Sequence, residues 1–243
     1  MRFVLIHGAG CTPASFGSSF VTRLAGAVAF ALPGRLGDMR PADSVASFAT
    51  AVGSSVAAAF GDEDVVLCGH SMGGAIALEL ALRAGAAGSA VAAGAGNVRG
   101  VVALDSGSRL RVAPVIFERL EADFTAACAD LARMFFADPS SERFDAAVAD
   151  MATVGQEQTI RDFRACDAFD AGERLHELPV PLLAVTGERD AMTPPKYALS
   201  LADRVPSGSA RIIADAGHFA IVERPDDVAS AIAAFAAALP PRR

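Results

Sequence analysis

The stretch Gly69-His70-Ser71-Met72-Gly73-Gly74 decides the fold that this chain predicts. It follows the apolar run Val65–Cys68, which is typical of a buried strand, and precedes the helix-forming run Ala75–Leu82. A G-x-S-x-G motif between a strand and a helix is typical of a nucleophile elbow, a sharp turn that exposes the serine hydroxyl. Glycines two residues before and after the serine allow neighbouring backbone to pass close by. The motif therefore predicts Ser71 as a nucleophile at the carboxyl edge of a sheet, where the helix dipole favours negative charge.

Short apolar segments alternate with helical patterns along most of the chain. The apolar segments are nearly continuous in hydrophobicity, which is typical of parallel strands covered on both faces. They are Phe3–Ile6, Val28–Leu32, Val65–Cys68, Val101–Leu104, Leu182–Val185 and Ala210–Ile213. The helical patterns between and after them are Ser15–Leu24, Ser44–Phe60, Ala75–Ala84, Tyr197–Arg204 and Pro225–Leu239. This alternation predicts an α/β fold with a doubly wound, mostly parallel sheet of about six strands.

The region between the fourth and fifth expected strands interrupts this alternation. About 70 residues, from Gly107 to Pro181, show no strand pattern, and apolar residues at helical spacing occupy Pro114–Phe136, Glu142–Met151 and Gln156–Phe169. The segment is far longer than a crossover, so we expect a helical cap or lid at residues 107–181. The α/β core would then comprise residues 1–106 and 182–243. A second irregular run, Gly85–Gly100, is rich in glycine, alanine and serine and is interpreted as a flexible surface loop.

Composition limits the classes of partner. A chain of 243 residues with 52% apolar content can bury one large core. The net charge of −7 gives no basic patch for nucleic acid. Phe3–Ile6 is too short for a signal-peptide core, and no apolar stretch predicts a membrane span, so a cytoplasmic location is the default expectation.

The four cysteines have no C-x-x-C spacing, which indicates neither a zinc site nor a disulfide framework. No metal or cofactor is expected. Cys11 follows the His7-Gly8 turn and so lies near the expected site, although burial in the core is its preferred role.

A nucleophilic serine needs a base to accept its proton. Of the four histidines, His218 lies in a turn just beyond the last expected strand, at the carboxyl edge where such sheets build their sites. We therefore prefer His218 as the base. His70 lies inside the elbow and should point away from the nucleophile, His7 follows the first strand, and His176 lies near the end of the expected cap.

The base in turn needs an acid that holds its tautomer. Asp190 follows the fifth expected strand and is the preferred acid, which gives the order Ser71, Asp190, His218. Asp105, at the end of the fourth strand, is the competing candidate, and Glu188 is a weaker one.

An oxyanion hole requires two hydrogen-bond donors. The backbone N–H of Met72, at the start of the helix, can supply one. The turn His7-Gly8-Ala9-Gly10 can supply the other, through the N–H of Ala9, because its small residues let backbone approach a substrate.

With these residues assembled, the chain resembles the α/β-hydrolase superfamily, in particular the compact cap-bearing branch of small carboxylesterases, enol-lactonases and plant methyl-esterase-like enzymes. The matching motifs are His7-Gly8-Ala9-Gly10, Leu32-Pro33-Gly34, Gly69–Gly74, Thr186–Asp190 with Met192-Thr193-Pro194, and Ala216-Gly217-His218 with Glu223-Arg224-Pro225. Two departures matter. The chain begins at the strand with the oxyanion turn. The first two strands that are usual in the family are therefore missing, and a six-stranded, wholly parallel sheet is expected. The usual Pro-Gly-His-Gly turn reads Pro33-Gly34-Arg35-Leu36-Gly37, which should alter one rim of the pocket.

The resemblance implies two-step acyl transfer, in which Ser71 attacks an ester or related carbonyl and water activated by His218 releases the acid. Apolar residues expected near the mouth indicate a small, largely apolar ester or lactone as the substrate. These residues are Phe16, Phe117, Met134, Phe135, Phe136, Met151, Met192 and Phe219.

Several alternatives stay open. Carbon–carbon bond hydrolases and perhydrolase or haloperoxidase-like enzymes share the triad, and some small-molecule receptors retain it. The lack of tryptophan counts against carbon–carbon hydrolases. A serine at position 71 argues against dehalogenases and epoxide hydrolases, which use an aspartate, and Phe219 replaces the lysine of plant hydroxynitrile lyases. The oligomeric state is open, a homodimer included.

Overall fold

A computed structural model describes residues 1–38, 40, 42–86, 97–138 and 141–241 of the chain. Within this part, six strands form one sheet in the order β2-β1-β3-β4-β5-β6, and every neighbouring pair is parallel. The wholly parallel, six-stranded sheet that the sequence predicts is therefore confirmed. The strands are β1 (Arg2–Ile6), β2 (Ala27–Phe30), β3 (Asp64–His70), β4 (Asn97–Leu104), β5 (Leu182–Gly187) and β6 (Gly208–Ile213).

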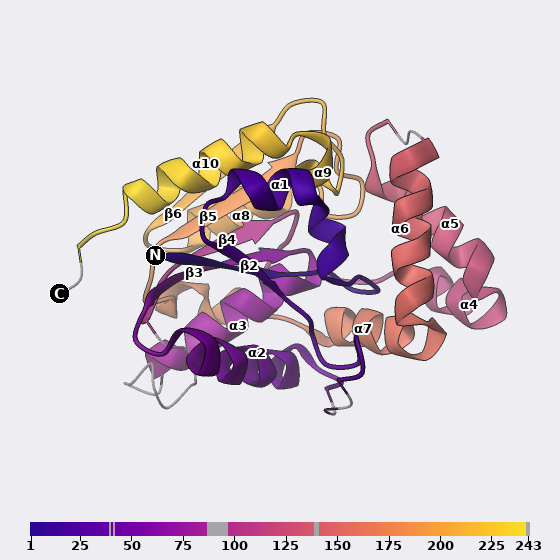
Figure 1. The fold of residues 1–243 in the computed structure, drawn as a ribbon, viewed down its shortest axis with the longest axis horizontal. Helices are drawn as coiled ribbons and strands as arrows, with labels where there is room; N and C mark the ends of the chain where they lie inside the picture. The colour runs from indigo at the N-terminus through magenta and orange to yellow at the C-terminus, as the bar shows by residue number, and fades with distance from the viewer. Residues whose placement is uncertain (39, 41, 87–96, 139–140, 242–243) are drawn as a thin grey trace.

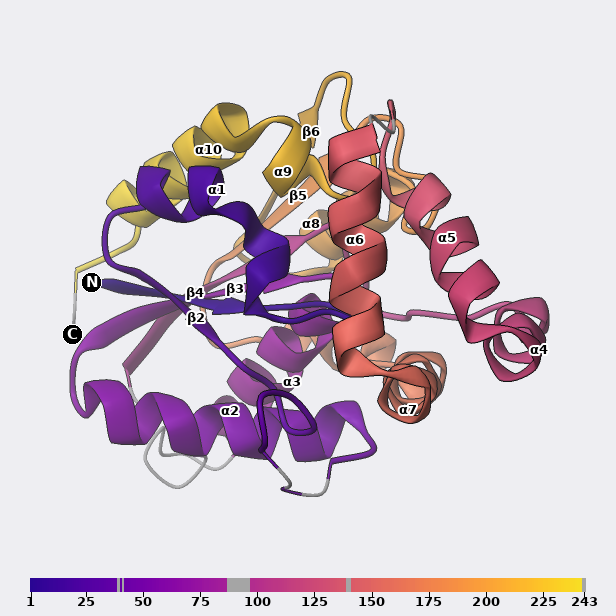
Figure 2. The same cartoon turned by 45° about the vertical axis from the view of Figure 1, so that its right-hand side comes forward.

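Helices cover both faces of the sheet (Figures 1 and 2). Helices α1 and α10 lie on one face, and α2 and α3 lie on the other. The described helices outside the segment between β4 and β5 are η1 (Pro13–Phe16), α1 (Gly17–Arg23), α2 (Val45–Phe60), α3 (Met72–Ala86), α8 (Lys196–Arg204), α9 (Ala220–Glu223) and α10 (Pro225–Ala237).

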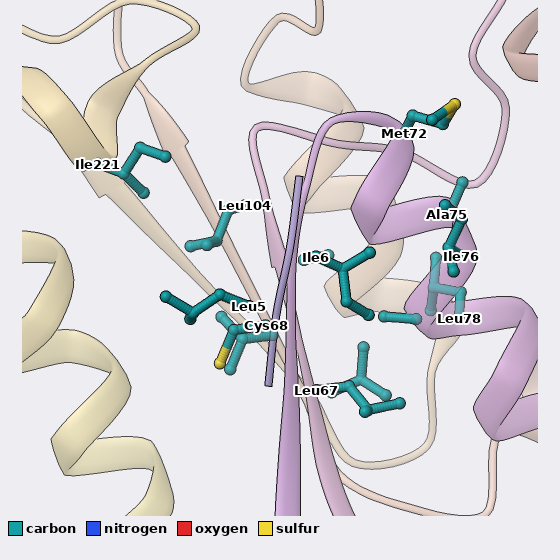
Figure 3. Packing of buried hydrophobic residues seen from close by; sticks show 14 of the residues in the cluster. Leu5, Ile6, Leu67, Cys68, Met72, Ala75, Ile76, Leu78, Leu104 and Ile221 are labelled. Atoms are coloured by element: carbon teal, nitrogen blue, oxygen red, sulfur yellow. The ribbon is translucent and has the colours of Figure 1, made fainter. Parts of the chain in front are cut away.

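The side chains of the central strands point alternately to the two faces of the sheet, and both faces are buried. Leu5 and Cys68, which are neighbours in the β1–β3 register, point to one face. Ile6 and Leu67 point to the other face, toward Ile76 of α3 (Figure 3). All of these side chains are fully buried. Burial on both faces explains why the strands appear in the sequence as continuous apolar runs.

In the described part of the chain, four α-helices lie between β4 and β5, beyond the carboxyl ends of the strands (Figure 2). We call them the α4–α7 segment: α4 (Pro114–Ala122), α5 (Phe124–Phe135), α6 (Ser141–Val154) and α7 (Gln156–Ala168). The sequence predicted one helix over Pro114–Phe136, but the structure divides it at Asp123. The Asp123 carboxylate accepts a hydrogen bond from the Ala126 N–H and so caps α5. A short 3-10 helix, η2 (Gly172–Glu177), which the sequence pattern did not predict, leads back to β5.

The predicted loop at residues 85–100 is shorter in the structure. Helix α3 continues to Ala86, and β4 already begins at Asn97. Residues 87–96 lie outside the described part of the chain. No helix of the described residues is both long enough and apolar enough to cross a membrane.

Candidate active site

Ser71 occupies the sharp turn between β3 and α3. Its φ of 53° lies in the left-handed region, which L-residues rarely adopt outside strained sites. Two hydrogen bonds of 2.8 Å hold the turn: the Ser71 N–H donates to Leu104 O, and the Ser106 hydroxyl donates to Ser71 O. The backbone geometry is that of the predicted elbow.

The glycines of the elbow allow the close backbone approach that the motif predicts. A Cβ at Gly69 would lie 2.0 Å from the carbonyl oxygen of Gly73, and a Cβ at Gly73 would lie 1.9 Å from that of Ile6. Both distances are far inside van der Waals contact, so neither position accepts a side chain without moving the backbone.

The loops after β5 and β6 bring Asp190 and His218 together. His218 Nδ1 lies 2.9 Å from Asp190 Oδ2, and both side chains are buried. Asp190 also accepts hydrogen bonds from the N–H groups of Met192 and Thr193, each at 2.8 Å, and from the Thr193 hydroxyl at 2.7 Å. Burial raises the pKa of Asp190, but the interaction with His218 and these donors outweigh it, so the pKa lies below its usual value.

Thr193 is a site residue whose role the sequence analysis missed. Its hydroxyl lies 3.2 Å from His218 Nδ1 as well as 2.7 Å from Asp190 Oδ2. The spacing Asp190-x-x-Thr193, in which a carboxylate binds the N–H and hydroxyl three residues on, is the signal that was available.

Ser71 and His218 line one cavity of about 60 Å³. No hydrogen bond joins Ser71 to His218 in the described part of the chain, so their shared position on this cavity is what places them together. Catalytic hydrogen bonds are often long before substrate binds. Of the eight apolar residues expected near the mouth, Phe135, Met192 and Phe219 line this cavity.

The other five expected mouth residues lie elsewhere. Phe136 lines a neighbouring cavity of about 590 Å³, which shares Cys11, Phe135 and Phe219 with the first. Phe16 and Met151 are buried, and Phe117 and Met134 line neither of these two cavities. The lining residues that the sequence analysis missed come largely from the segment after β4: Leu110, Arg111, Val112, Phe163, Cys166 and Tyr197.

The competing acid, Asp105, does not contact His218 by a hydrogen bond in the described residues. Its Oδ1 accepts from the Gly187 N–H at 2.9 Å, and its Oδ2 lies 4.0 Å from His70 Nε2. Burial, reinforced by the charge of Asp190, raises the pKa of Asp105 well above its usual value. Asp105 is therefore held toward its neutral form.

Ala9, which the sequence analysis expects to be an oxyanion donor, lies in the turn after β1. The buried ring of His7 fixes this turn, because Nε2 accepts from the Leu32 N–H at 3.2 Å and Nδ1 therefore donates to Gly8 O at 3.0 Å. Burial, with a smaller contribution from Arg35, lowers the pKa of His7 to about 3. Ala9 lines the cavity, whereas Met72 is fully buried at the first position of α3. Within the described residues no hydrogen bond engages the N–H of Ala9 or of Met72, so both donors are free for a ligand.

The position of Arg35 differs from the prediction that the Pro33–Gly37 turn alters one rim of the pocket. Arg35 lies outside the lining of the cavity that holds Ser71, and its guanidinium is buried against Asp162 of α7. All four cysteines are buried free thiols, and Cys11 also lines both cavities. Burial accordingly raises the pKa of the Cys11 thiol.

Comparison with known proteins agrees with this geometry. Residues 3–231 match the alpha/beta hydrolase family, and the chain belongs to that family. No curated protein sequence matches it. Solved structures that share its fold include three enzymes of different substrate class. A thermophilic esterase is 26% identical with a TM-score of 0.80, covering 96% of this chain and 88% of that one.

The other two structures are more distant in sequence. The enol-lactonase from Burkholderia xenovorans is 19% identical with a TM-score of 0.81, covering 97% of this chain and 91% of that one. A 2-hydroxy-6-oxo-6-phenylhexa-2,4-dienoate hydrolase from Rhodococcus is 22% identical with a TM-score of 0.77, covering 98% and 90%. Together with the family match, these similarities support the assignment of this protein as a hydrolase.

Proposed function

We propose that this protein is a serine hydrolase that cleaves a small, largely apolar ester or lactone through an acyl-enzyme on Ser71. The observation that carries the proposal is the buried Asp190–His218 hydrogen bond of 2.9 Å, because its histidine lines the same cavity as Ser71, whose φ is positive. That solved structures of the same fold include esterases and an enol-lactonase supports the ester or lactone class.

In the proposed mechanism, His218 Nε2 accepts the Ser71 hydroxyl proton while Oγ attacks the substrate carbonyl. The Asp190 carboxylate orients His218 through Nδ1 and stabilises the imidazolium. The tetrahedral oxyanion accepts hydrogen bonds from the N–H groups of Ala9 and Met72. As the carbonyl reforms, the leaving alcohol takes the proton from His218, and a water activated by His218 then hydrolyses the acyl-enzyme.

We further propose that residues 107–181 act as a cap on a core of residues 1–106 and 182–243. The segment contributes the apolar side chains of Leu110, Val112 and Phe163 to the cavity that holds Ser71, together with Arg111 and Cys166. A void of about 60 Å³ next to Ser71 suits a short acyl group. We therefore expect p-nitrophenyl acetate or butyrate to be cleaved faster than the octanoate.

A fluorophosphonate probe tests the nucleophile. The wild-type protein should be labelled at Ser71, and Ser71→Ala should not be labelled although it folds equally well. Turnover of p-nitrophenyl esters should fall with the label. Failure of the folded wild type to react with the probe would contradict the proposal and favour a binding protein that retains the triad.

A further inference from the structure

The oxyanion turn after β1 is held from outside the sheet by two helices of the α4–α7 segment. The Gly10 N–H donates to Asp162 Oδ2 of α7 at 2.9 Å. The Thr12 N–H donates to Asp150 Oδ2 of α6 at 2.9 Å, and the Thr12 hydroxyl donates to the same carboxylate. Two cap carboxylates therefore bind the backbone of a turn that lies 152 and 138 residues earlier in the sequence.

Arg35 completes the arrangement around Asp162. Its guanidinium forms a two-pronged ion pair with the carboxylate, and its Nε donates to Cys11 O at 3.1 Å. The Arg35 and Asp162 side chains are 1% and 0% exposed. Gln158 Nε2 donates to Asp162 Oδ1 at 3.0 Å, so both carboxylate oxygens are fully engaged.

Helix α7 also packs tightly on the two turns that it binds. Gly34 has a φ of 82°, and a Cβ there would lie 2.3 Å from Gln158 Oε1. Gly10 has a φ of 63°, and a Cβ there would lie 3.1 Å from Thr159 Cγ2. Side chains of α7 therefore lie directly against the backbone of both turns, where a Cβ would have little or no space.

These contacts surround Ala9 without using its N–H. On one side His7 Nδ1 donates to Gly8 O, and on the other Asp162 accepts from the Gly10 N–H. We propose that Asp162 is a positioning residue of the oxyanion hole: it fixes the Ala9–Gly10 peptide and thereby aims the Ala9 N–H, with Arg35 as its counter-ion. This inference rests on the proposed function, and it makes the cap a structural part of the catalytic machinery.

A purely structural ion pair would have a different signature. Replacement of a buried ion pair by apolar residues of similar volume is often neutral for stability. Such a replacement would nevertheless remove the acceptor of the Gly10 N–H. The two roles therefore separate when stability and kcat are measured on the same variants.

The test compares Arg35→Met/Asp162→Asn with Arg35→Met/Asp162→Leu. Asparagine and leucine have nearly the same shape, but only the amide oxygen of asparagine can accept the Gly10 N–H. We expect kcat for p-nitrophenyl acetate to be about 10- to 100-fold lower in the leucine variant, with KM within about threefold, since one oxyanion donor contributes 10²–10³ in rate. Inhibition by an aryl trifluoromethyl ketone, a tetrahedral transition-state analogue, should weaken in proportion to kcat/KM.

Equal kcat and equal inhibition in the two folded double variants would overturn the proposal. If the leucine variant does not fold, Asp162→Glu replaces it. Glutamate keeps the charge opposite Arg35 but displaces the acceptor by one methylene, so we expect at least a tenfold loss of kcat, and an unchanged kcat would overturn the proposal. Glu157→Gln is the matched control, because Glu157 is an exposed residue of the same helix whose side chain pairs with Arg161.

Failure of this inference is distinguishable from failure of the proposed function. If wild type shows no labelling that depends on Ser71, the proposed function is wrong and the role of Asp162 falls with it. If wild type is labelled and turns over ester, but the acceptor at position 162 has no effect on kcat, only the positioning role is wrong.

Discussion

Two histidine–aspartate pairs lie side by side at the carboxyl edge of the sheet. They differ in the distance between imidazole and carboxyl group and in the hydrogen-bond partners of the carboxyl group. In one, His218 Nδ1 and Asp190 Oδ2 are 2.9 Å apart. In the other, His70 Nε2 and Asp105 Oδ2 are 4.0 Å apart. All four side chains are buried, and the two imidazole rings are centred only 5.0 Å from each other.

The difference comes from the donors that the backbone supplies. The loop after β5 gives the Asp190 carboxylate two N–H groups and the Thr193 hydroxyl besides His218, and these stabilise the charged form. Asp105, just after β4, receives the Gly187 N–H on Oδ1, while its buried Oδ2 has no hydrogen-bond partner of normal geometry among the described residues. His70 Nε2 instead lies 2.8 Å from His218 O. A carboxyl group beside an imidazole therefore need not be ionised, because the other hydrogen-bond donors around it also determine its charge.

The largest expected effect is the difference in kcat between a variant of Asp190 and a variant of Asp105. Asp190→Asn removes the charge that orients His218, and we expect kcat for p-nitrophenyl acetate to fall about 10³- to 10⁴-fold. Asp105→Asn resembles the protonated acid that the site already favours, so kcat should stay within about tenfold of wild type. Steady-state kinetics on both variants measures this contrast. The reverse result would assign the acid role to Asp105.

An intermediate effect concerns the charge of His70. Burial, reinforced by His218, lowers the pKa of His70 from 6.5 to about 3. As pH falls below 6.5 the unfolded chain takes up this proton while the folded chain does not, so the free energy of unfolding should fall by about 1.4 kcal/mol per pH unit. His70→Gln removes this contribution. Urea unfolding at pH 7, 6 and 5 should show a shallower slope for the variant, and parallel slopes would contradict a neutral His70.

The smallest expected effect has the opposite sign and concerns Asp105. Its raised pKa means that the folded protein keeps a proton that the unfolded chain loses above pH 4, so this carboxyl reduces stability as pH rises. Asp105→Asn has no such proton to lose. Its melting temperature relative to wild type should therefore rise between pH 4 and pH 8. A pH-independent difference would show that Asp105 is ionised in the fold.

Local patterns explain why much of the fold could be predicted from the sequence. The strand that ends at His70 and the helix that begins at Met72 are adjacent in the chain, and glycine spacing around Ser71 reports the elbow directly. The strands could be located because burial on both faces makes each of them a continuous run of apolar residues in the sequence. His218 and Asp190 were placed near each other because loops that follow parallel strands meet at one edge.

The rest depends on contacts between residues distant in the chain. Arg35 pairs with Asp162, 127 residues later, and no local sequence pattern indicates this ion pair. The turn that contains Arg35 was therefore interpreted as part of a pocket rim. The cavity wall formed by Phe163 depends on how α7 docks, which helical periodicity does not specify. The break at Asp123 did carry a local signal, an acid three residues before an N–H that it caps, but the surrounding apolar spacing concealed it.

The outer strands of the sheet have a consequence for how this protein behaves at high concentration. Strand β2, at one edge, has only four residues, and Pro33 follows it closely. Strand β6, at the other edge, begins at Gly208 and carries the exposed side chains of Ser209 and Arg211. Short or charged edges offer little template for another chain to add a strand, so the sheet is protected from edge-to-edge aggregation.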